Sequence, residues 1–210
     1  MRHIVLLGDS VLDNAGYTAG EPAVIDHLCL FLPETWKATR LARDGSLTTD
    51  VIGQLEKLPV DATHLVVSAG GNNALQQIAL LGEPAQSVAE ALQRMNLVGE
   101  QFERDYQQML QAILAHQLPT ILCTIYNTNL DEPFLQPIVR AGLMTFNDTI
   151  LRAAFQAGLA VIDLRLICIT PEDYTNSIEP SAKGGQKIAN AIAQALQVHD
   201  FKYGRTVVYV

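Results

Sequence analysis

Short apolar runs recur along the whole chain, and they constrain the fold more than any other feature of the sequence. They favour β-strands, are bounded by turn residues, and are mostly continuous rather than alternating. A continuous apolar run is typical of a strand that is buried on both faces of a sheet. We therefore expect strands at residues 3–7, 38–42, 64–68, 120–126 and 159–164.

Helical patterns lie between these runs. Their apolar residues recur at spacings of three and four, which places each set on one face of a helix. Gly158 ends the third set, where a left-handed cap is expected, and the stretch after Ile25 predicts further helix and core. The four sets are Val51, Ile52 and Leu55; Phe102, Tyr106, Met109, Leu110 and Ile113; Leu143, Phe146 and Ile150; and Ile188, Ile192 and Leu196.

Strand and helix thus alternate about five times, which predicts a parallel sheet between two helix layers, a three-layer α/β/α sandwich with right-handed crossovers. The tail, residues 205–210, alternates weakly and is expected to add an edge strand or to pack over one. No internal repeat, linker or low-complexity segment interrupts the pattern, and 210 residues is an ordinary length for one domain. We expect a single domain over residues 1–210.

The charge and the length of the apolar runs argue against several functional classes. The 14 Lys and Arg residues against 22 Asp and Glu residues give a net charge of −8, which does not favour binding to nucleic acid or to an anionic membrane. The first apolar run stops at Gly8, too early for a signal peptide, and no other run approaches the roughly 20 residues that cross a bilayer. We expect a soluble, cytoplasmic protein.

The cysteines do not indicate disulfides or a metal site. Cys29, Cys123 and Cys168 are odd in number, stand in apolar surroundings and lack the spacing of metal ligands. We expect all three to be small core residues in a reducing compartment.

Four loops follow predicted strands and should open at one edge of the sheet, because the carboxyl ends of parallel strands meet there. Ser10 comes directly after a strand and a glycine, so its hydroxyl could be exposed and its N–H could point toward a developing oxyanion. On its own, such a serine more often caps a helix. The loops are G-D-S-V-L-D-N at 8–14, R-D-G-S at 43–46, A-G-G-N-N at 69–73 and Y-N-T-N at 126–129.

Two of the other loops carry hydrogen-bond donors. Gly45 can bring a bare backbone N–H close to a ligand, and Asn72 can offer a side-chain N–H. Each residue alone is also common in ordinary turns. A serine, a glycine N–H and an asparagine amide at one edge together describe a nucleophile with a three-donor oxyanion hole.

Four sequence blocks resemble the SGNH or GDSL hydrolase family and span nearly the whole chain. They are G-D-S near the N-terminus, an isolated glycine after the second strand, G-x-N-x after the third, and a late loop ending in P-S-x-x-G-G. The resemblance implies a flavodoxin-like α/β/α fold with Ser10 as the nucleophile. It also implies an oxyanion hole made by the N–H groups of Ser10 and Gly45 and the amide of Asn72.

The last block departs from the family pattern, which is Asp-x-x-His-Pro. Aligned on Pro180, this chain has Asn176 and Glu179 at the positions of the acid and the base, and Asn73 stands where the family usually has Asp. No histidine stands at an obvious position to replace the base. Glu179 could accept the proton of Ser10, but its reference pKa lies about 2 units below that of histidine, so burial would have to raise it. The Asn176 amide could donate to the Glu179 carboxylate and hold it in place.

Three functions remain open from the sequence. The first is a serine hydrolase that acts on small ester or acyl substrates through a Ser10 acyl-enzyme, with Glu179, oriented by Asn176, in the position of the base. The second is a non-catalytic ligand-binding protein of the same fold, and the third is an acyltransferase that uses the same residues. Substrate identity and oligomeric state are not encoded in any pattern that we find.

Several further residues are candidates to line the site: Asp9, Asp13, Asn73 and Tyr126. Asp9 is expected to serve the sharp turn and Asp13 to cap the helix that follows. Together with Glu179 and Asp173 they lack the spacing of a metal-binding loop, and no phosphate cradle follows the first strand, so we expect neither a metal nor another cofactor.

Overall fold

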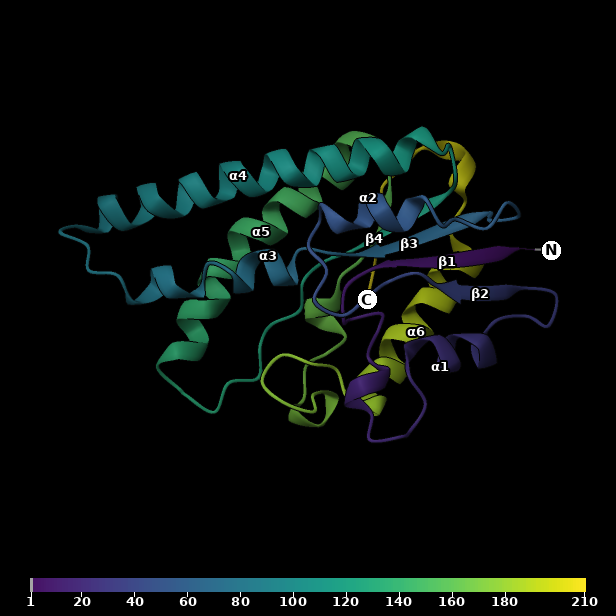
Figure 1. Cartoon of the computed structure of the whole chain (residues 1–210), viewed down its shortest axis with the longest axis horizontal. Helices are drawn as coiled ribbons and strands as arrows, with labels where there is room; N and C mark the ends of the chain where they lie inside the picture. The colour runs from purple at the N-terminus through teal and green to yellow at the C-terminus, as the bar shows by residue number, and fades with distance from the viewer. Residues whose placement is uncertain (1) are drawn as a thin grey trace.

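The computed structural model describes residues 2–210, and in this range six parallel strands form one sheet in the order β2-β1-β3-β4-β5-β6. Helices cover both faces (Figure 1). The predicted three-layer α/β/α fold is therefore confirmed, with six strands in place of about five. The strands are β1 His3–Gly8, β2 Lys37–Arg40, β3 His64–Ser68, β4 Thr120–Cys123, β5 Ala160–Ile162 and β6 Val208–Tyr209.

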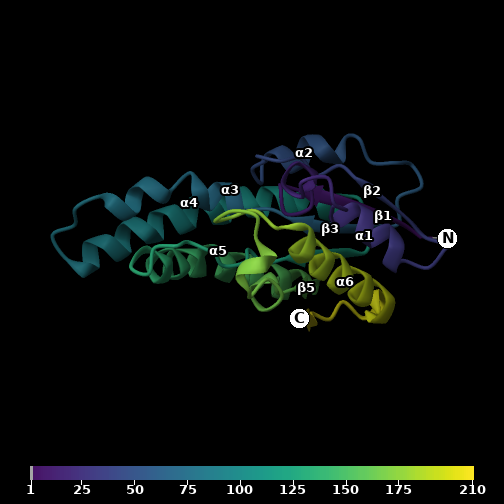
Figure 2. The same ribbon diagram turned by 90° about the horizontal axis from the view of Figure 1, so that it is seen from below.

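The two faces of the sheet carry different helices, as Figures 1 and 2 show. Helices α1 (Val24–Phe31) and α6 (Ala182–Val198) pack on one face. Helices α2 (Asp50–Leu55), α4 (Val88–Ala115) and α5 (Leu135–Ala157) pack on the other. The short elements are the α-helix α3 Gly71–Leu75 and five 3₁₀ helices, labelled η: η1 Ala15–Tyr17, η2 Ile78–Gly82, η3 Leu164–Leu166, η4 Pro171–Asp173 and η5 Phe201–Tyr203.

Alternate residues of the central strands feed the two cores. In β1, Ile4 and Leu6 belong to the core under α1 and α6, whereas Val5 and Leu7 belong to the core under α4 and α5. Successive strand side chains point to opposite faces, so a strand buried on both sides must be continuously apolar, which is the pattern in the sequence. The apolar helix residues named from their spacing are buried, except Ile52, which is half-buried. Gly158 has φ 64° and ends α5 as predicted.

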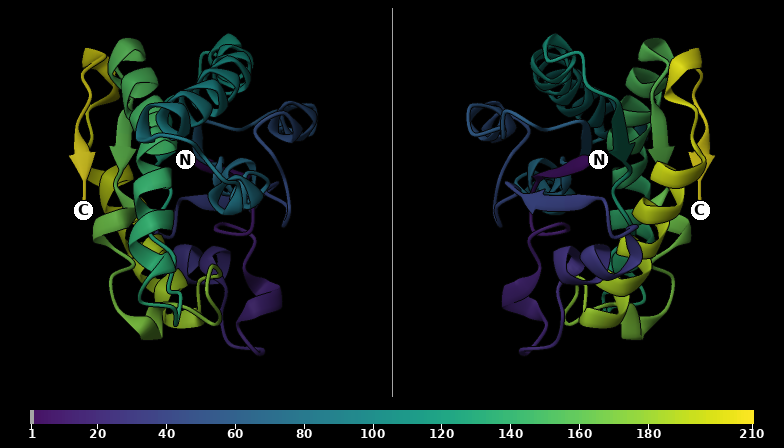
Figure 3. Two further views of the ribbon diagram at one scale, coloured as in Figure 1. Left: turned by 90° about the vertical axis from the view of Figure 1, so that its left-hand side faces the viewer. Right: turned by 90° about the vertical axis from the view of Figure 1, so that its right-hand side faces the viewer.

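The chain leaves the sheet earlier than the apolar runs suggest. Strand β2 stops at Arg40, because the N–H groups of Leu41 and Ala42 both turn back to the carbonyl of Leu6, at 2.9 Å each. Strand β4 stops at Cys123 rather than at residue 126. The tail forms β6, which pairs in parallel with β5 and lies at the outer edge of the sheet (Figure 3).

One of the three cysteines lies outside the core. Cys123 and Cys168 are buried as expected, but Cys29 is exposed. The inward face of α1 is formed by Val24 and Leu28, and the helical turn of about 100° per residue carries Cys29 away from that face. The prediction for Cys29 was therefore wrong.

Helix α4 is much longer than the sheet is deep. Its 28 residues span about 42 Å, and together with α5 it extends past the carboxyl ends of the strands, where α3 lies beside it (Figure 1). No helix in residues 2–210 combines the length and the apolar character that a membrane span requires.

Candidate active site

A cleft of about 280 Å³ opens at the carboxyl edge of the sheet. The segments directly after β1, β3 and β4 contribute to its lining, as does the loop that precedes α6. Its walls are mostly apolar side chains of α4, α5 and the segment 74–81. The polar lining residues are few: Asp9, Ser10, Asn72, Gln77, Tyr126, Thr128 and Glu179.

Ser10 lies at the start of a sharp turn after β1. The turn begins at Gly8, which has φ 126°, and a Cβ atom at this position would lie 1.7 Å from the carbonyl oxygen of Ser68. Only glycine fits there. The N–H groups of Leu12 and Asp13 then donate to the carbonyl of Asp9, at 3.2 and 3.1 Å, and close a helical turn around Ser10.

Three N–H donors are available near Ser10. Within residues 2–210 the backbone N–H groups of Ser10 and Gly45 donate to no protein acceptor. One hydrogen of the Asn72 amide goes to the carbonyl oxygen of Ser46, at 3.0 Å, and its second hydrogen is left for a ligand. Asn72 lines the cleft with Ser10, whereas Gly45 is outside the lining and directly precedes Ser46, whose carbonyl oxygen accepts the Asn72 amide.

Glu179 reaches the same cleft from the loop between η4 and α6. Its side chain is 7% exposed, and its Oε2 atom has no hydrogen-bond partner in the described part of the chain. Burial raises the pKa of Glu179, while the nearby Ser10 hydroxyl lowers it in part. Both side chains line the cleft.

The side chain of Asn176 supports Glu179 by a different route from the one we expected. Its Oδ1 atom accepts hydrogen bonds from the backbone N–H groups of Ile178 and Glu179, at 2.9 and 2.8 Å. The turn is closed by a bond of 2.9 Å from the N–H of Thr175 to the carbonyl of Glu179. Asn176 thus holds the backbone that carries Glu179 and makes no hydrogen bond to the Glu179 carboxylate.

Of the four candidate lining residues, Asp9 and Tyr126 are part of the cleft and Asp13 and Asn73 are not. Asp13 pairs with Arg40 and accepts the N–H of Asp44 at 3.0 Å, so it ties two loops together and caps no helix. Asn73 accepts from the N–H of Thr48 at 3.1 Å and donates to its hydroxyl at 3.2 Å.

The two remaining candidates have distinct surroundings. The Tyr126 hydroxyl donates to the carbonyl of Ile178 at 2.6 Å and so holds the loop of Glu179 over the cleft. Asp9 is 2% exposed, and its Oδ1 accepts the N–H of Val11 at 3.2 Å. Burial, with a smaller contribution from the charge of Glu179, raises the pKa of Asp9 to about 7.

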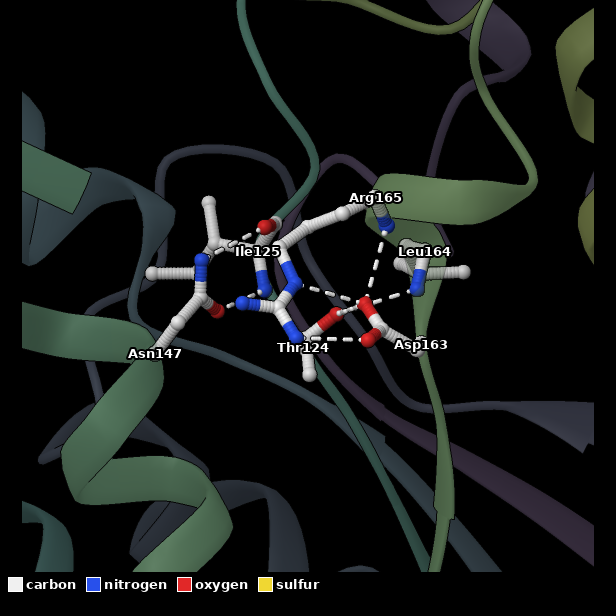
Figure 4. A network of polar contacts seen from close by, with 6 residues as sticks. All are labelled: Thr124, Ile125, Asn147, Asp163, Leu164 and Arg165. Atoms are coloured by element: carbon white, nitrogen blue, oxygen red, sulfur yellow. Dashed lines mark hydrogen bonds and ion pairs between the residues drawn. The ribbon is translucent and has the colours of Figure 1, made fainter. Parts of the chain in front are cut away.

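A separate polar network closes the ends of β4 and β5 (Figure 4). The Thr124 hydroxyl donates to Asp163 at 2.9 Å, and Arg165 forms a two-pronged pair with the same carboxylate. Beside it, the Asn147 side chain accepts the N–H of Ile125 at 2.8 Å and donates to its carbonyl at 2.9 Å. These bonds explain why β4 ends before residue 126, since the backbone groups of Ile125 are taken by a side chain.

Sequence reasoning missed Gln54 and the helices that wall the cleft. Gln54 is 7% exposed and binds the backbone of Gly8. A signal was present, because Gln54 stands at the buried spacing of Val51 and Leu55 on α2, where a polar residue needs a partner. The walls of the cleft gave no comparable signal, since an apolar stripe on a helix is more often core.

The Ser10 turn, the Asn72 side chain and the loop of Glu179 thus come together in one cleft at the carboxyl edge of an α/β/α sheet. The chain belongs to the GDSL-like lipase/acylhydrolase family, whose model matches residues 6–187. A search among curated proteins finds no match.

Solved structures share the fold over nearly the whole chain. The lipase Lip_vut3 from a goat rumen metagenome has a TM-score of 0.70 and 18% identity, covering 98% of this chain and 99% of that one. The lipase/acylhydrolase from Enterococcus faecalis has a TM-score of 0.67 and 20% identity, covering 94% and 96%. Phospholipase A1 from Streptomyces albidoflavus NA297 has a TM-score of 0.67 and 15% identity, covering 93% and 98%. At these identities the likeness establishes the fold.

Proposed function

We propose that this protein is a serine acyl hydrolase that cleaves esters of apolar acids through an acyl-enzyme on Ser10, with Glu179 as the base. One observation carries the proposal. Ser10 and the buried Glu179 carboxyl group line the same cleft, whose walls are mostly apolar. Membership of an acylhydrolase family supports it independently.

In the first half of the reaction, ionised Glu179 takes the proton of the Ser10 hydroxyl as Oγ attacks the carbonyl carbon of the ester. The negative charge on the carbonyl oxygen is stabilised by the N–H groups of Ser10 and Gly45 and by the Asn72 amide. The carbon–oxygen bond to the alcohol then breaks, and protonated Glu179 returns its proton to the departing alkoxide. Water repeats the sequence on the acyl-enzyme and releases the acid.

The surroundings of Glu179 suit this role better than an exposed position would. A carboxylate of ordinary pKa is a weak base, and the rise that burial causes brings its proton affinity closer to that of histidine. Within residues 2–210 the Oε2 atom of Glu179 has no hydrogen-bond partner, so this atom is free to accept a proton.

The apolar walls provide the place for the acyl chain. The cleft is lined by Val139, Leu143 and Phe146 on α5 and by Met95 on α4. Each methylene group buried there contributes about 0.8 kcal/mol. We therefore expect esters of medium-length acids to be better substrates than acetate.

A fluorophosphonate probe tests the proposal, because it labels only an activated serine. Wild-type protein should be labelled at Ser10 and should hydrolyse p-nitrophenyl octanoate, whereas Ser10→Ala should do neither and should keep the same unfolding temperature. A non-catalytic binding protein would give no labelling. A protein that is labelled by the probe, does not hydrolyse the ester in water, and consumes the ester when an alcohol acceptor is added would be an acyltransferase instead.

A further inference from the structure

The backbone next to the nucleophile is held by a buried side chain that the mechanism above does not use. Gln54 lies on α2, and its Oε1 atom accepts the N–H of Gly8 while its Nε2 atom donates to the carbonyl of Gly8, both at 2.8 Å. Two bonds to one residue fix both the position and the orientation of the strand end that leads into Ser10.

The same amide group also reaches the second loop of the oxyanion hole. The Nε2 atom of Gln54 donates its other hydrogen to the hydroxyl of Ser46 at 3.2 Å. Ser46 directly follows Gly45, and its carbonyl accepts the Asn72 amide at 3.0 Å. A continuous chain of hydrogen bonds therefore joins the three segments that carry the N–H donors.

Two further contacts anchor the loop that carries Gly45 and Ser46, and one of them reaches the Gly8 turn through the backbone. Thr48 is fully buried and exchanges two hydrogen bonds with Asn73 at the start of α3. The N–H of Arg43 also donates to the carbonyl of Gly8 at 3.0 Å. Gln54 is the side chain that bonds both the Gly8 turn and the Ser46 segment.

We propose that Gln54 is a positioning residue that sets the spacing between the oxyanion-hole donors and Ser10. The inference rests on the proposed function and adds a residue to it. Donors stabilise an oxyanion only when they lie within hydrogen-bond distance of the place where the charge develops, and misplacement by about 1 Å lowers the rate by about 10²-fold. Gln54 touches no reacting atom, so its effect should fall on kcat rather than on KM.

Two variants separate positioning from simple stability. Gln54→Leu removes the hydrogen bonds to Gly8 and Ser46. We expect kcat and the rate of Ser10 labelling to fall by about 10²-fold, with KM within about threefold of wild type. In Gln54→Glu a protonated carboxyl group can still accept from Gly8 N–H and donate to Gly8 O, whereas the ionised form cannot donate. This variant should be most active relative to wild type at low pH and should lose activity as the introduced group ionises.

Thr120 offers a control away from the cleft. It is 2% exposed at the start of β4, at the amino edge of the sheet, and its hydroxyl donates to the carbonyl of Leu118 at 2.8 Å. Thr120→Val removes a buried hydrogen bond, so it should lower the unfolding temperature and should leave kcat and the labelling rate near those of wild type.

The experiment measures kcat, KM, labelling rate and unfolding temperature for the wild type and the three variants. Equal loss of kcat in Gln54→Leu and Thr120→Val, or wild-type labelling in a folded Gln54→Leu, would overturn the positioning role. If Gln54→Leu does not fold, the pH profile of Gln54→Glu decides, and a profile parallel to wild type counts against the proposal. Absence of labelling in the wild type itself would refute the proposed function, and the positioning role with it.

Discussion

At the scale of single residues, the identity of the base sets the pH dependence of the rate. Only the ionised form of Glu179 can take the Ser10 proton, so activity should be lost as the pH falls through the pKa of this group. Burial raises the pKa of Glu179, so the fall of activity on the acidic side of the pH profile, its acidic limb, should lie at a higher pH than an ordinary glutamate would give. Because a second carboxyl group, Asp9, titrates nearby, the position of the limb belongs to the pair rather than to Glu179 alone.

We expect Glu179→Gln to remove this limb and to lower kcat/KM by about 10²- to 10⁴-fold, the usual contribution of a general base. The pH profile of kcat/KM for an activated ester is the measurement. Glu172→Gln, an exposed acid on η4, is the control and should match wild type. Substantial activity that does not respond to Glu179→Gln would leave Ser10 as nucleophile and exclude Glu179 as the base.

The double variant Asn176→Asp, Glu179→His follows from the same geometry. An aspartate at 176 keeps the acceptor oxygen that receives the N–H groups of residues 178 and 179, so the turn should survive. In the pH profile of kcat/KM, the acidic limb of this variant should then move toward the pKa of histidine.

At the scale of secondary-structure elements, the proposed function predicts that the packing of α4 against α5 determines how long an acyl chain the cleft accepts. Gly142 on α5 lines the cleft, and a Cβ atom there would lie 3.9 Å from the Cε atom of Met95 on α4, an ordinary contact. Alanine should therefore fit at this position, and a larger side chain should fill the space that the acyl chain of the substrate would occupy.

Gly142→Leu should lower kcat/KM for p-nitrophenyl octanoate at least about tenfold more than for the acetate, since exclusion of two methylene groups already removes about 1.6 kcal/mol. Gly142→Ala is the control: it should keep the chain-length preference and stabilise α5 by up to about 1 kcal/mol. An equal effect of Gly142→Leu on both esters would place the acyl chain elsewhere.

The elements also show what a sequence can reveal about such a site. The apolar runs located the loops after β1 and β3, and parallel strands bring these loops to one edge, so the meeting of Ser10 and Asn72 was predictable. The partners of Asp13 and Gln54 were not, because Arg40 and Gly8 lie far away in sequence and are brought close only by tertiary packing. The sequence also indicated a contact between Asn176 and Glu179, but the atoms that make it depend on the conformation of the turn between them.

At the scale of the whole molecule, the burial of Asp9 beside the nucleophile links folding to proton binding. The pKa of Asp9 is about 7 in the folded protein, against an ordinary value of 3.8. Between these values the folded state binds more protons than the unfolded state, so the free energy of unfolding falls as the pH rises. The contribution of this group is complete below pH 4 and is lost by pH 7, and its full size is up to about 4 kcal/mol.

Asp9→Asn should remove this dependence, because an amide resembles the protonated carboxyl group and its Oδ1 can still accept the N–H of Val11. Urea unfolding at pH 4.5 and pH 8 should show the variant gaining stability relative to wild type at the higher pH, while other carboxylates cancel in the comparison. A parallel pH dependence of the two proteins would mean that Asp9 is already ionised in the fold. The contribution of Asp9 to the stability of the fold is thereby expected to be smaller at the pH where Glu179 is ionised than in mild acid.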